Sequence, residues 1–150
     1  MKRLIPILVL LISMSCYGQR DGKMNERIKA QKVAFITDKL NLTPEEASKF
    51  WPIYNASEER IESVRNKEMR AIKSKVRQNP DLSEKEADIL LQDLIAAEDK
   101  MYRAKLDLIN NLKGVIPSKK IIHLKRVEDE FNRILLQRLK EMRQKRGNRN

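Results

Sequence analysis

The sequence predicts an all-α protein, an elongated antiparallel helical hairpin or open bundle of three long helices preceded by a short one. Charged residues make up 35% of the 150-residue chain, aromatic residues make up 5%, and there are four glycines. Few glycines and aromatics, together with many Leu, Ala, Glu, Lys and Arg residues, favour helix over sheet. Beyond residue 18, apolar residues recur at helical intervals and the period-two alternation of strands is absent. A chain of this length usually forms one domain.

The first eighteen residues have the pattern of a secretory signal peptide. Lys2 and Arg3 precede the apolar run Leu4–Met14, which is too short to cross a bilayer as a stable helix. Small residues follow this run, and we expect cleavage after Gly18. Attachment of a lipid at Cys16 is the alternative. The pattern therefore predicts that the chain is exported.

A capping motif marks the start of the second helix. Its threonine is a preferred N-cap, the next residue is a proline at the first helical position, and a glutamate three residues after the threonine completes a capping box. A good N-cap stabilises a helix by about 1 kcal/mol. A shorter helix is expected before the motif, over Glu26–Leu40, and the second helix should end at Asn79, because the residue before a proline avoids the α region. The motif consists of Leu42, Thr43, Pro44, Glu45 and Glu46.

The third helix is expected to begin at a second capping box, formed by Ser83 and Glu86, and to end at Lys113-Gly114. Its apolar residues recur with the 4-3 spacing of a coiled coil, which is typical of a helix that packs lengthwise on a neighbour. The final helix should start near Pro117. The predicted seam of the third helix comprises Ala87, Leu91, Leu94, Glu98, Met101, Lys105, Leu108 and Leu112, and it is widened by Ile95, Tyr102, Leu106 and Ile109.

The formal net charge of +11 would by itself suggest a nucleic-acid partner. An exported chain does not meet genomic DNA, so we expect no nucleic acid. Unfolded or acidic polypeptides are the expected partners instead, with possible peripheral contact between the chain and an anionic membrane surface.

Charge is arranged in blocks along the chain. Six cations and one anion give Arg65–Arg77 a charge of +5, whereas six anions and one cation give Glu84–Asp99 a charge of −5. If the turn between these blocks folds the helices antiparallel, exposed pairs worth about 0.2–1 kcal/mol each would register the hairpin. Cations that find no partner would instead line a basic surface. A third basic block approaches the C-terminus, where we expect the helical domain 19–146 to give way to a flexible basic tail at 147–150. The candidate basic surface consists of Arg65, Lys67, Arg70, Lys73, Lys75 and Arg77.

The sequence offers little that could carry catalysis. One histidine and one cysteine exclude a Cys/His zinc site and a Cys-His dyad. No glycine-rich phosphate loop and no activated-serine pattern is present. Neighbouring carboxylates such as Glu45 and Glu46 point apart on a helix and do not form an acid–base pair. We therefore expect no enzyme, no catalytic residue, no metal and no cofactor.

The second helix carries a cluster of large apolar residues at nearly consecutive positions. Adjacent positions of a helix point in different directions, so these side chains cannot all face the same core. Phe50, Trp51, Ile53 and Tyr54 follow one another around Pro52, early in the second helix. These side chains either pack under the first helix or form a contact with a client or with a second chain.

The stretch Leu42–Glu46, opening a long helix in an exported basic chain, resembles the Spy/CpxP-like periplasmic family, which has the LTXXQ motif. The longer stretch Val33–Glu46, running on to Phe50–Asn55, looks like a branch common in Bacteroidetes whose members are often labelled sensors associated with extracytoplasmic-function sigma factors. Glu46 stands where the family motif has Gln, and Leu82–Glu86 and Ile116–Lys120 are imperfect second copies.

The resemblance implies a chaperone-like or a sensory role. Members of the family form cradle-shaped antiparallel dimers with a basic concave face and bind unfolded proteins without ATP, while others damp an envelope stress kinase or sense heavy metal. We therefore expect an ATP-independent holdase for unfolded or acidic polypeptides. The alternative is an envelope-stress sensor or regulatory partner of an extracytoplasmic-function sigma factor or envelope signalling protein. A homodimer is expected in either case, because long helices bury their apolar stripes only partly within one chain.

Overall fold

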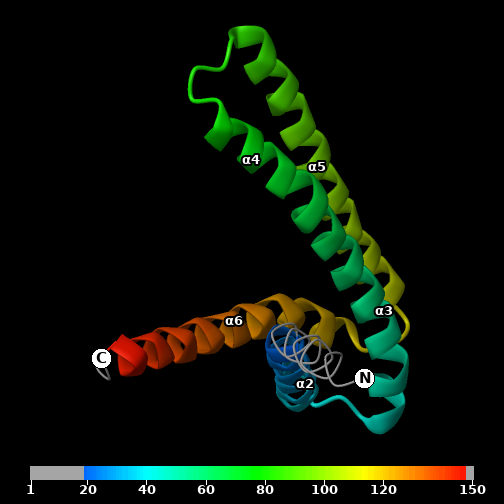
Figure 1. The fold of residues 1–150 in the computed structure, drawn as a ribbon. Coiled ribbons are helices and arrows are strands. Elements are labelled where there is room, and N and C mark those ends of the chain that lie inside the picture. The colour runs from blue at the N-terminus through cyan, green and yellow to red at the C-terminus, as the bar shows by residue number, and fades with distance from the viewer. Residues whose placement is uncertain (1–18, 148–150) are drawn as a thin grey trace, which may run out of the picture. The chain divides into compact units, whose positions relative to one another are not determined.

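The computed structural model describes residues 19–147, with the side chains of residues 19–22 and Arg146 left out. The predicted signal peptide, the alternative lipid site at Cys16 and the last three residues of the predicted tail therefore lie outside the described residues. Within the described range the chain forms helices joined by short turns and contains no β-strand (Figure 1). This confirms the predicted all-α class. By internal contacts the described part of the chain divides into two units, one made of residues 42–123 and the other of residues 19–41 and 124–147.

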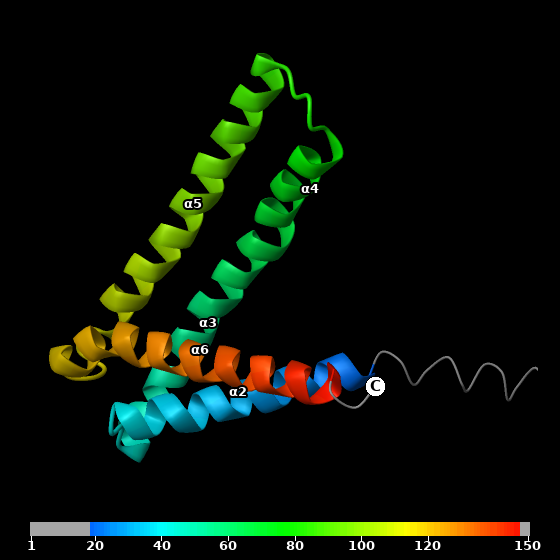
Figure 2. The ribbon, with the colours of Figure 1, turned by 90° about the vertical axis from the view of Figure 1, so that its left-hand side faces the viewer.

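The first unit is an antiparallel helical hairpin, as predicted. Its outgoing arm runs through α3 (Pro44–Val64), the π-helical segment η2 (Arg65–Met69) and α4 (Arg70–Gln78), and its returning arm is α5 (Glu84–Leu112) (Figures 1 and 2). At 1.5 Å per residue the outgoing arm is about 50 Å long and α5 about 44 Å. The sequence did not predict the π-helical segment, which is a rare conformation without a sequence signature of its own.

Small residues bring the two arms of the hairpin together. Ser57 is buried on α3, and its hydroxyl donates a hydrogen bond to the backbone carbonyl of Ala104 on α5 at 3.0 Å. Ala97 and Ala104 are themselves buried, whereas Leu91 is exposed. The predicted 4-3 seam of α5 is therefore partly wrong, because the helix turns its small residues toward the opposite arm. The buried face of α5 consists of Leu90, Ala97, Ala104, Leu108 and Leu112.

The second unit pairs α2 (Gln19–Lys39) with the part of α6 (Ser118–Gly147) that begins at Leu124. The two helices lie side by side in Figure 2. The rings of Phe35 and Phe131 are 5.6 Å apart between centroids. Helix α2 begins at Gln19, earlier than the predicted Glu26, because nothing after Gln19 breaks a helix; Gly22 is tolerated in its first turn.

Two polar contacts also join α2 and α6. Lys39 forms an ion pair of 3.0 Å with Glu130, and Arg138 donates a hydrogen bond of 3.5 Å to the side chain of Gln31. None of the helices in the described part of the chain has the length and apolar content required to cross a membrane.

Candidate functional site

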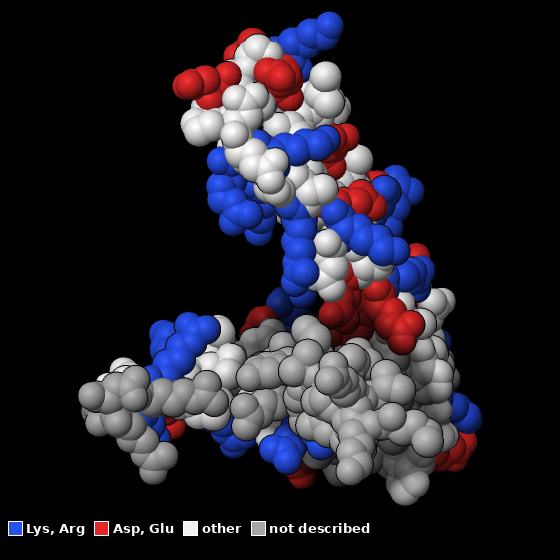
Figure 3. All heavy atoms as spheres, viewed as in Figure 1, with Lys and Arg blue, Asp and Glu red and all other residues white. Residues whose placement is uncertain are grey.

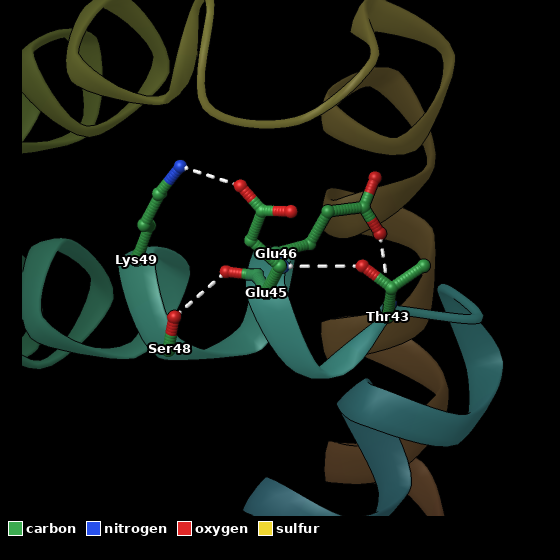
Figure 4. Close-up of polar contacts among 5 residues, drawn as sticks. All are labelled: Thr43, Glu45, Glu46, Ser48 and Lys49. Atoms are coloured by element: carbon green, nitrogen blue, oxygen red, sulfur yellow. Dashed lines mark hydrogen bonds and ion pairs between the residues drawn. The ribbon is translucent and has the colours of Figure 1, made fainter.

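The capping motif folds as its sequence predicts. Thr43 Oγ1 accepts a hydrogen bond from the backbone N–H of Glu46 at 3.2 Å, and Glu46 Oε2 accepts one from the backbone N–H of Thr43 at 2.8 Å (Figure 4). Pro44 is the first residue of α3, where its missing N–H leaves no helical hydrogen bond unmade. Leu42 is buried just before the helix. The motif therefore fixes where α3 begins.

Glu46 also forms an ion pair with a residue of a second helix, α6. Lys120, in the first turn of α6, places Nζ 2.6 Å from Glu46 Oε2, and both side chains are partly buried. The hydrogen bond from Lys120, followed by the one from the Thr43 backbone, holds the pKa of Glu46 below its usual range. The neighbouring Glu45 is exposed and pairs with Lys49 one turn along α3, at 2.9 Å. The five motif residues thus serve to start α3 and to attach α6.

Sequence reasoning missed the role of Lys120. Its residue type and its position, 74 residues from Glu46, give no local sign of the contact. The stretch Ile116–Lys120 is an imperfect copy of the family motif, and Pro117 predicts the start of the final helix. Neither signal identifies the partner of the lysine.

The aromatic cluster belongs mainly to the interior. Phe50 and Tyr54 are buried and stack at 5.4 Å, while Trp51 is half-buried and packs edge-on against both, at 5.0 Å and 5.4 Å. Ile53 is also half-buried. The proposed client or dimer contact at Phe50 and Tyr54 is therefore wrong: residues four apart share one helix face, and here that face is the buried one.

The six cations of the candidate basic surface lie on the outgoing arm of the hairpin. All six are exposed, and none forms an ion pair within the described residues. Basic side chains gather over the side of the hairpin on which α4 lies (Figure 3). Three of them, Arg70, Lys73 and Arg77, follow each other at helical spacings of three and four residues, which places them on one face of α4.

The two charge blocks do not pair with one another. The ion pairs that cross the hairpin are Arg60–Asp107, at 3.2 Å, and Glu68–Lys100, at 2.9 Å. In the second pair, Glu68 is the single acidic residue of the basic block, and Lys100 lies just after the end of the acidic block. The expectation that opposite blocks register the hairpin is therefore wrong, since burial of small and apolar residues sets the register instead. The cations stay available to other molecules.

Apolar side chains are exposed close to these cations. Val76 on α4 and Ile89 on α5 are both about half exposed. Near the turn of the hairpin lies a hollow of about 360 Å³ between the end of α4 and the start of α5. Its walls combine apolar and charged groups. The lining residues are Lys75, Gln78, Asn79, Leu82, Glu86, Ile89 and Leu90.

Residues 19–147 contain no group of three or more His, Cys, Asp or Glu side chains arranged to hold a metal ion. Helix α6 extends to Gly147, so the predicted end of the helical domain at residue 146 differs by one residue. No protein-family model, curated protein or solved structure matches the chain. The resemblance to the Spy/CpxP-like family therefore stays a prediction.

Proposed function

We propose that this protein is an ATP-independent, chaperone-like protein of the periplasm that holds unfolded or acidic polypeptides. The observation that carries the proposal is the candidate basic surface: six exposed cations within thirteen residues, none of which forms an ion pair with another residue that the structure describes. Unfolded polypeptides present carboxylates and apolar side chains that a folded protein keeps apart or buries. A surface that offers cations beside exposed apolar groups suits both features.

Attraction between charges would act first, because it extends over about 10 Å at moderate salt, whereas apolar contacts act only on touch. Val76 and the hollow beside Ile89 would then provide the apolar contacts. When a client folds, it buries its apolar groups and its carboxylates become separated over its surface. Its affinity for the basic surface therefore falls. Release would therefore require no nucleotide.

The proposed compartment follows from the sequence of the first eighteen residues and from the resemblance to periplasmic proteins. In the periplasm the acidic polymer available to a basic surface is protein or membrane rather than genomic DNA. ATP is not needed for the mechanism, and no motif for its phosphates occurs in the sequence.

The test is suppression of aggregation. A chemically denatured acidic protein is diluted out of denaturant with the purified chain, and light scattering is followed at low salt and at 1 M salt. We expect the chain to slow aggregation at low salt and to lose most of this effect at 1 M, where the screening length falls to about 3 Å. If aggregation at low salt proceeds as fast with the chain as without it, the proposal is wrong.

A triple substitution locates the effect on the basic surface. Arg70→Glu, Lys73→Glu and Arg77→Glu together reverse one exposed face of α4, and we expect them to abolish the low-salt protection. The matched control is the same reversal at three exposed cations of α2, which changes the net charge equally and should leave protection intact. An equal loss in both variants would show that net charge, and not this surface, is responsible. The control substitutions are Lys23→Glu, Arg27→Glu and Lys29→Glu.

A further inference from the structure

The hollow at the far end of the hairpin, which we call the tip hollow, lies beyond the apolar core. It is placed between the last turns of α4 and the first turns of α5, beside the turn that joins them (Figures 1 and 2). Ile72 and Leu90 are the buried residues of the two arms that stand nearest to this turn, and none of residues 73–89 is buried. The core therefore stops short of the tip, where the arms border a hollow of about 360 Å³ instead.

Part of the wall of the tip hollow is apolar. Ile89 is 54% exposed, Leu82 in the turn is half-buried, and the buried Leu90 also lines the hollow. Apolar side chains that remain accessible around a concave surface often mark a binding site. The volume is near the lower end of the range of about 300–1,000 Å³ that is common for ligand pockets. A hollow of this size suits one large apolar side chain with a few polar atoms, rather than a long segment.

The charged groups of the tip hollow leave one cation available. Lys75 forms no hydrogen bond or ion pair within residues 19–147. Glu86, the one acid among the described lining residues, is already engaged, because its Oε2 accepts hydrogen bonds from the backbone N–H and the hydroxyl of Ser83, at 3.0 Å and 2.6 Å. A single lysine suits the single negative charge of a carboxylate better than the nearly double charge of a phosphate.

Two amide side chains complete the polar part of the tip hollow. The side chain of Asn79 makes no hydrogen bond within the part of the chain that the structure describes, and Gln78 donates one, to Ser74 Oγ at 3.0 Å. An amide side chain both donates and accepts hydrogen bonds, as the backbone of a peptide does. A fatty acid has a carboxylate and an apolar chain but no amide, and would make no use of donor and acceptor together. The lining therefore favours a peptide as the ligand.

The end of a polypeptide fits this combination better than its interior. In an extended chain neighbouring side chains point to opposite sides, so an internal acidic residue and the apolar residue beside it cannot both enter a small hollow. At the last residue of a chain, the carboxylate and the side chain are attached to the same carbon atom. Both can then enter the hollow together.

We propose that the tip hollow binds the free carboxyl-terminus of a polypeptide whose last residue has a large apolar side chain. The carboxylate pairs with Lys75, the apolar side chain lies against Leu82 and Ile89, and the amides of Gln78 and Asn79 meet the peptide backbone. Such recognition rests on the part of the proposed function that concerns polypeptide binding, and adds which end of the polypeptide this hollow holds.

The first test compares two peptides that differ in one group. A short labelled peptide without other charges ends in leucine with a free carboxylate, its counterpart ends in leucine amide, and binding to the purified chain is followed by fluorescence anisotropy. We expect the dissociation constant of the amide to be roughly tenfold higher, since a hydrogen bond between charged groups is lost. Equal binding of the two peptides, or no binding of either up to about 1 mM, would overturn the proposal.

The second test removes the cation. Lys75→Gln should raise the dissociation constant of the carboxylate peptide roughly tenfold and leave that of the amide unchanged, because the substitution and the amide remove the same contact. Lys85→Gln is the matched control: Lys85 is exposed near the same turn, changes the net charge equally and does not line the tip hollow. An equal effect of both substitutions on the carboxylate peptide would show that general attraction to positive charge is responsible, and would contradict the proposal.

The third test concerns the apolar wall. Ile89 and Ile95 are both 54% exposed on α5, but only Ile89 lines the tip hollow. Ile89→Ala should raise the dissociation constant of the leucine peptide several-fold, because apolar contact is lost, whereas Ile95→Ala should leave it unchanged. A peptide that ends in serine should bind more weakly than the leucine peptide and be insensitive to both substitutions. Equal losses from the two substitutions would place the binding elsewhere and refute the assignment.

Competition separates a peptide from a fatty acid as the ligand. We expect the unlabelled leucine peptide to displace the labelled one at a lower concentration than decanoate does, and the reverse order would overturn the proposal. The aggregation assay decides the proposed function separately. A chain that suppresses aggregation but binds neither peptide would remove only the tip-hollow proposal, and a chain that binds the carboxylate peptide without suppressing aggregation would remove only the chaperone proposal.

Discussion

Two glutamates in equivalent capping boxes have different surroundings. Glu46 and Glu86 each accept a hydrogen bond from the backbone N–H of their N-cap residue. The hydroxyl of Ser83 is the main cause that lowers the pKa of Glu86, whereas Lys120 is the main cause for Glu46. One box therefore acts within its own helix, and the other also joins two helices that are far apart in sequence.

This difference predicts that Glu46→Gln destabilises the protein more than Glu86→Gln at neutral pH. Glutamine can still complete the capping box, but it cannot form the ion pair with Lys120. The comparison is made by thermal unfolding of both variants at pH 7. Equal melting temperatures for the two variants would mean that the Lys120 contact contributes nothing to stability.

The pH dependence of stability provides a second test of the ion pair between Glu46 and Lys120. Because the pKa of Glu46 is lowered in the folded state, its contribution to stability is complete above the ordinary carboxylate pKa of about 4.3 and is lost as the pH falls through the lowered value. The gap in melting temperature between the unsubstituted chain and Glu46→Gln should therefore narrow on acidification below about pH 4.3. A gap that is constant across this range would show that the carboxylate charge has no role.

At the scale of the element, α5 carries apolar side chains on an exposed face as well as on its buried one, which explains why its contact face was hard to predict. The exposed apolar residues are Leu91, Ile95, Tyr102, Leu106 and Ile109. Apolar residues cover much of the helix circumference, so that periodicity alone allows several orientations. The structure buries the face that contains Ala97 and Ala104, because small side chains let α5 approach the outgoing arm closely enough for the hydrogen bond from Ser57. Leu90, Leu108 and Leu112 share this buried face, and the other large apolar residues are left on the outside.

The buried alanines give a prediction for the hairpin. Ala97 is fully buried and its neighbour Ala96 is exposed. Ala97→Leu should destabilise the protein by about 1–3 kcal/mol, because extra methylene groups in a packed contact force the arms apart. Ala96→Leu adds the same atoms to a solvent-facing position and should change the free energy of unfolding by less than about 0.5 kcal/mol. Denaturant unfolding of both variants tests the difference, and comparable losses would mean that the helix faces are assigned incorrectly.

At the scale of the whole molecule, charge is distributed by block rather than evenly. The chain carries 32 basic and 21 acidic residues, and its basic block on the outgoing arm and its acidic block on α5 are both solvent-exposed. Exposed pairs contribute little to stability, so this segregation adds little to folding. Its physical effect is on association, where blocks of one sign attract partners of the other.

Export would change this molecule before it folds. We expect the chain recovered from the envelope of its host to begin at Gln19, which removes Lys2, Arg3 and Cys16 and leaves 30 basic and 21 acidic residues, a net charge of +9. The mass of the intact recovered protein checks this. A chain that starts at Cys16 and carries the added mass of acyl groups would show lipid attachment instead, and an unprocessed chain would contradict export.

Much of the fold could be predicted because its signals are local. Thr43, Pro44 and Glu46 defined the start of one helix, Ser83 and Glu86 defined another, and Asn79 marked an end; all three boundaries are confirmed. Of the candidate site, the sequence identified the basic block but left open whether its cations pair across the hairpin or line a surface. These features depend on interactions within about one helical turn, which the sequence displays directly.

The sequence by itself determined the helices, their caps and the charge carried by each segment, because each of these depends on neighbouring residues. The tertiary structure alone decided which face of α5 is buried, that Phe50 and Tyr54 lie inside, that Lys120 meets Glu46, and that the two charge blocks do not pair. Each of these outcomes depends on contacts between residues far apart in the chain. Such contacts are chosen by packing of small and large side chains, and packing has no signature in a local pattern.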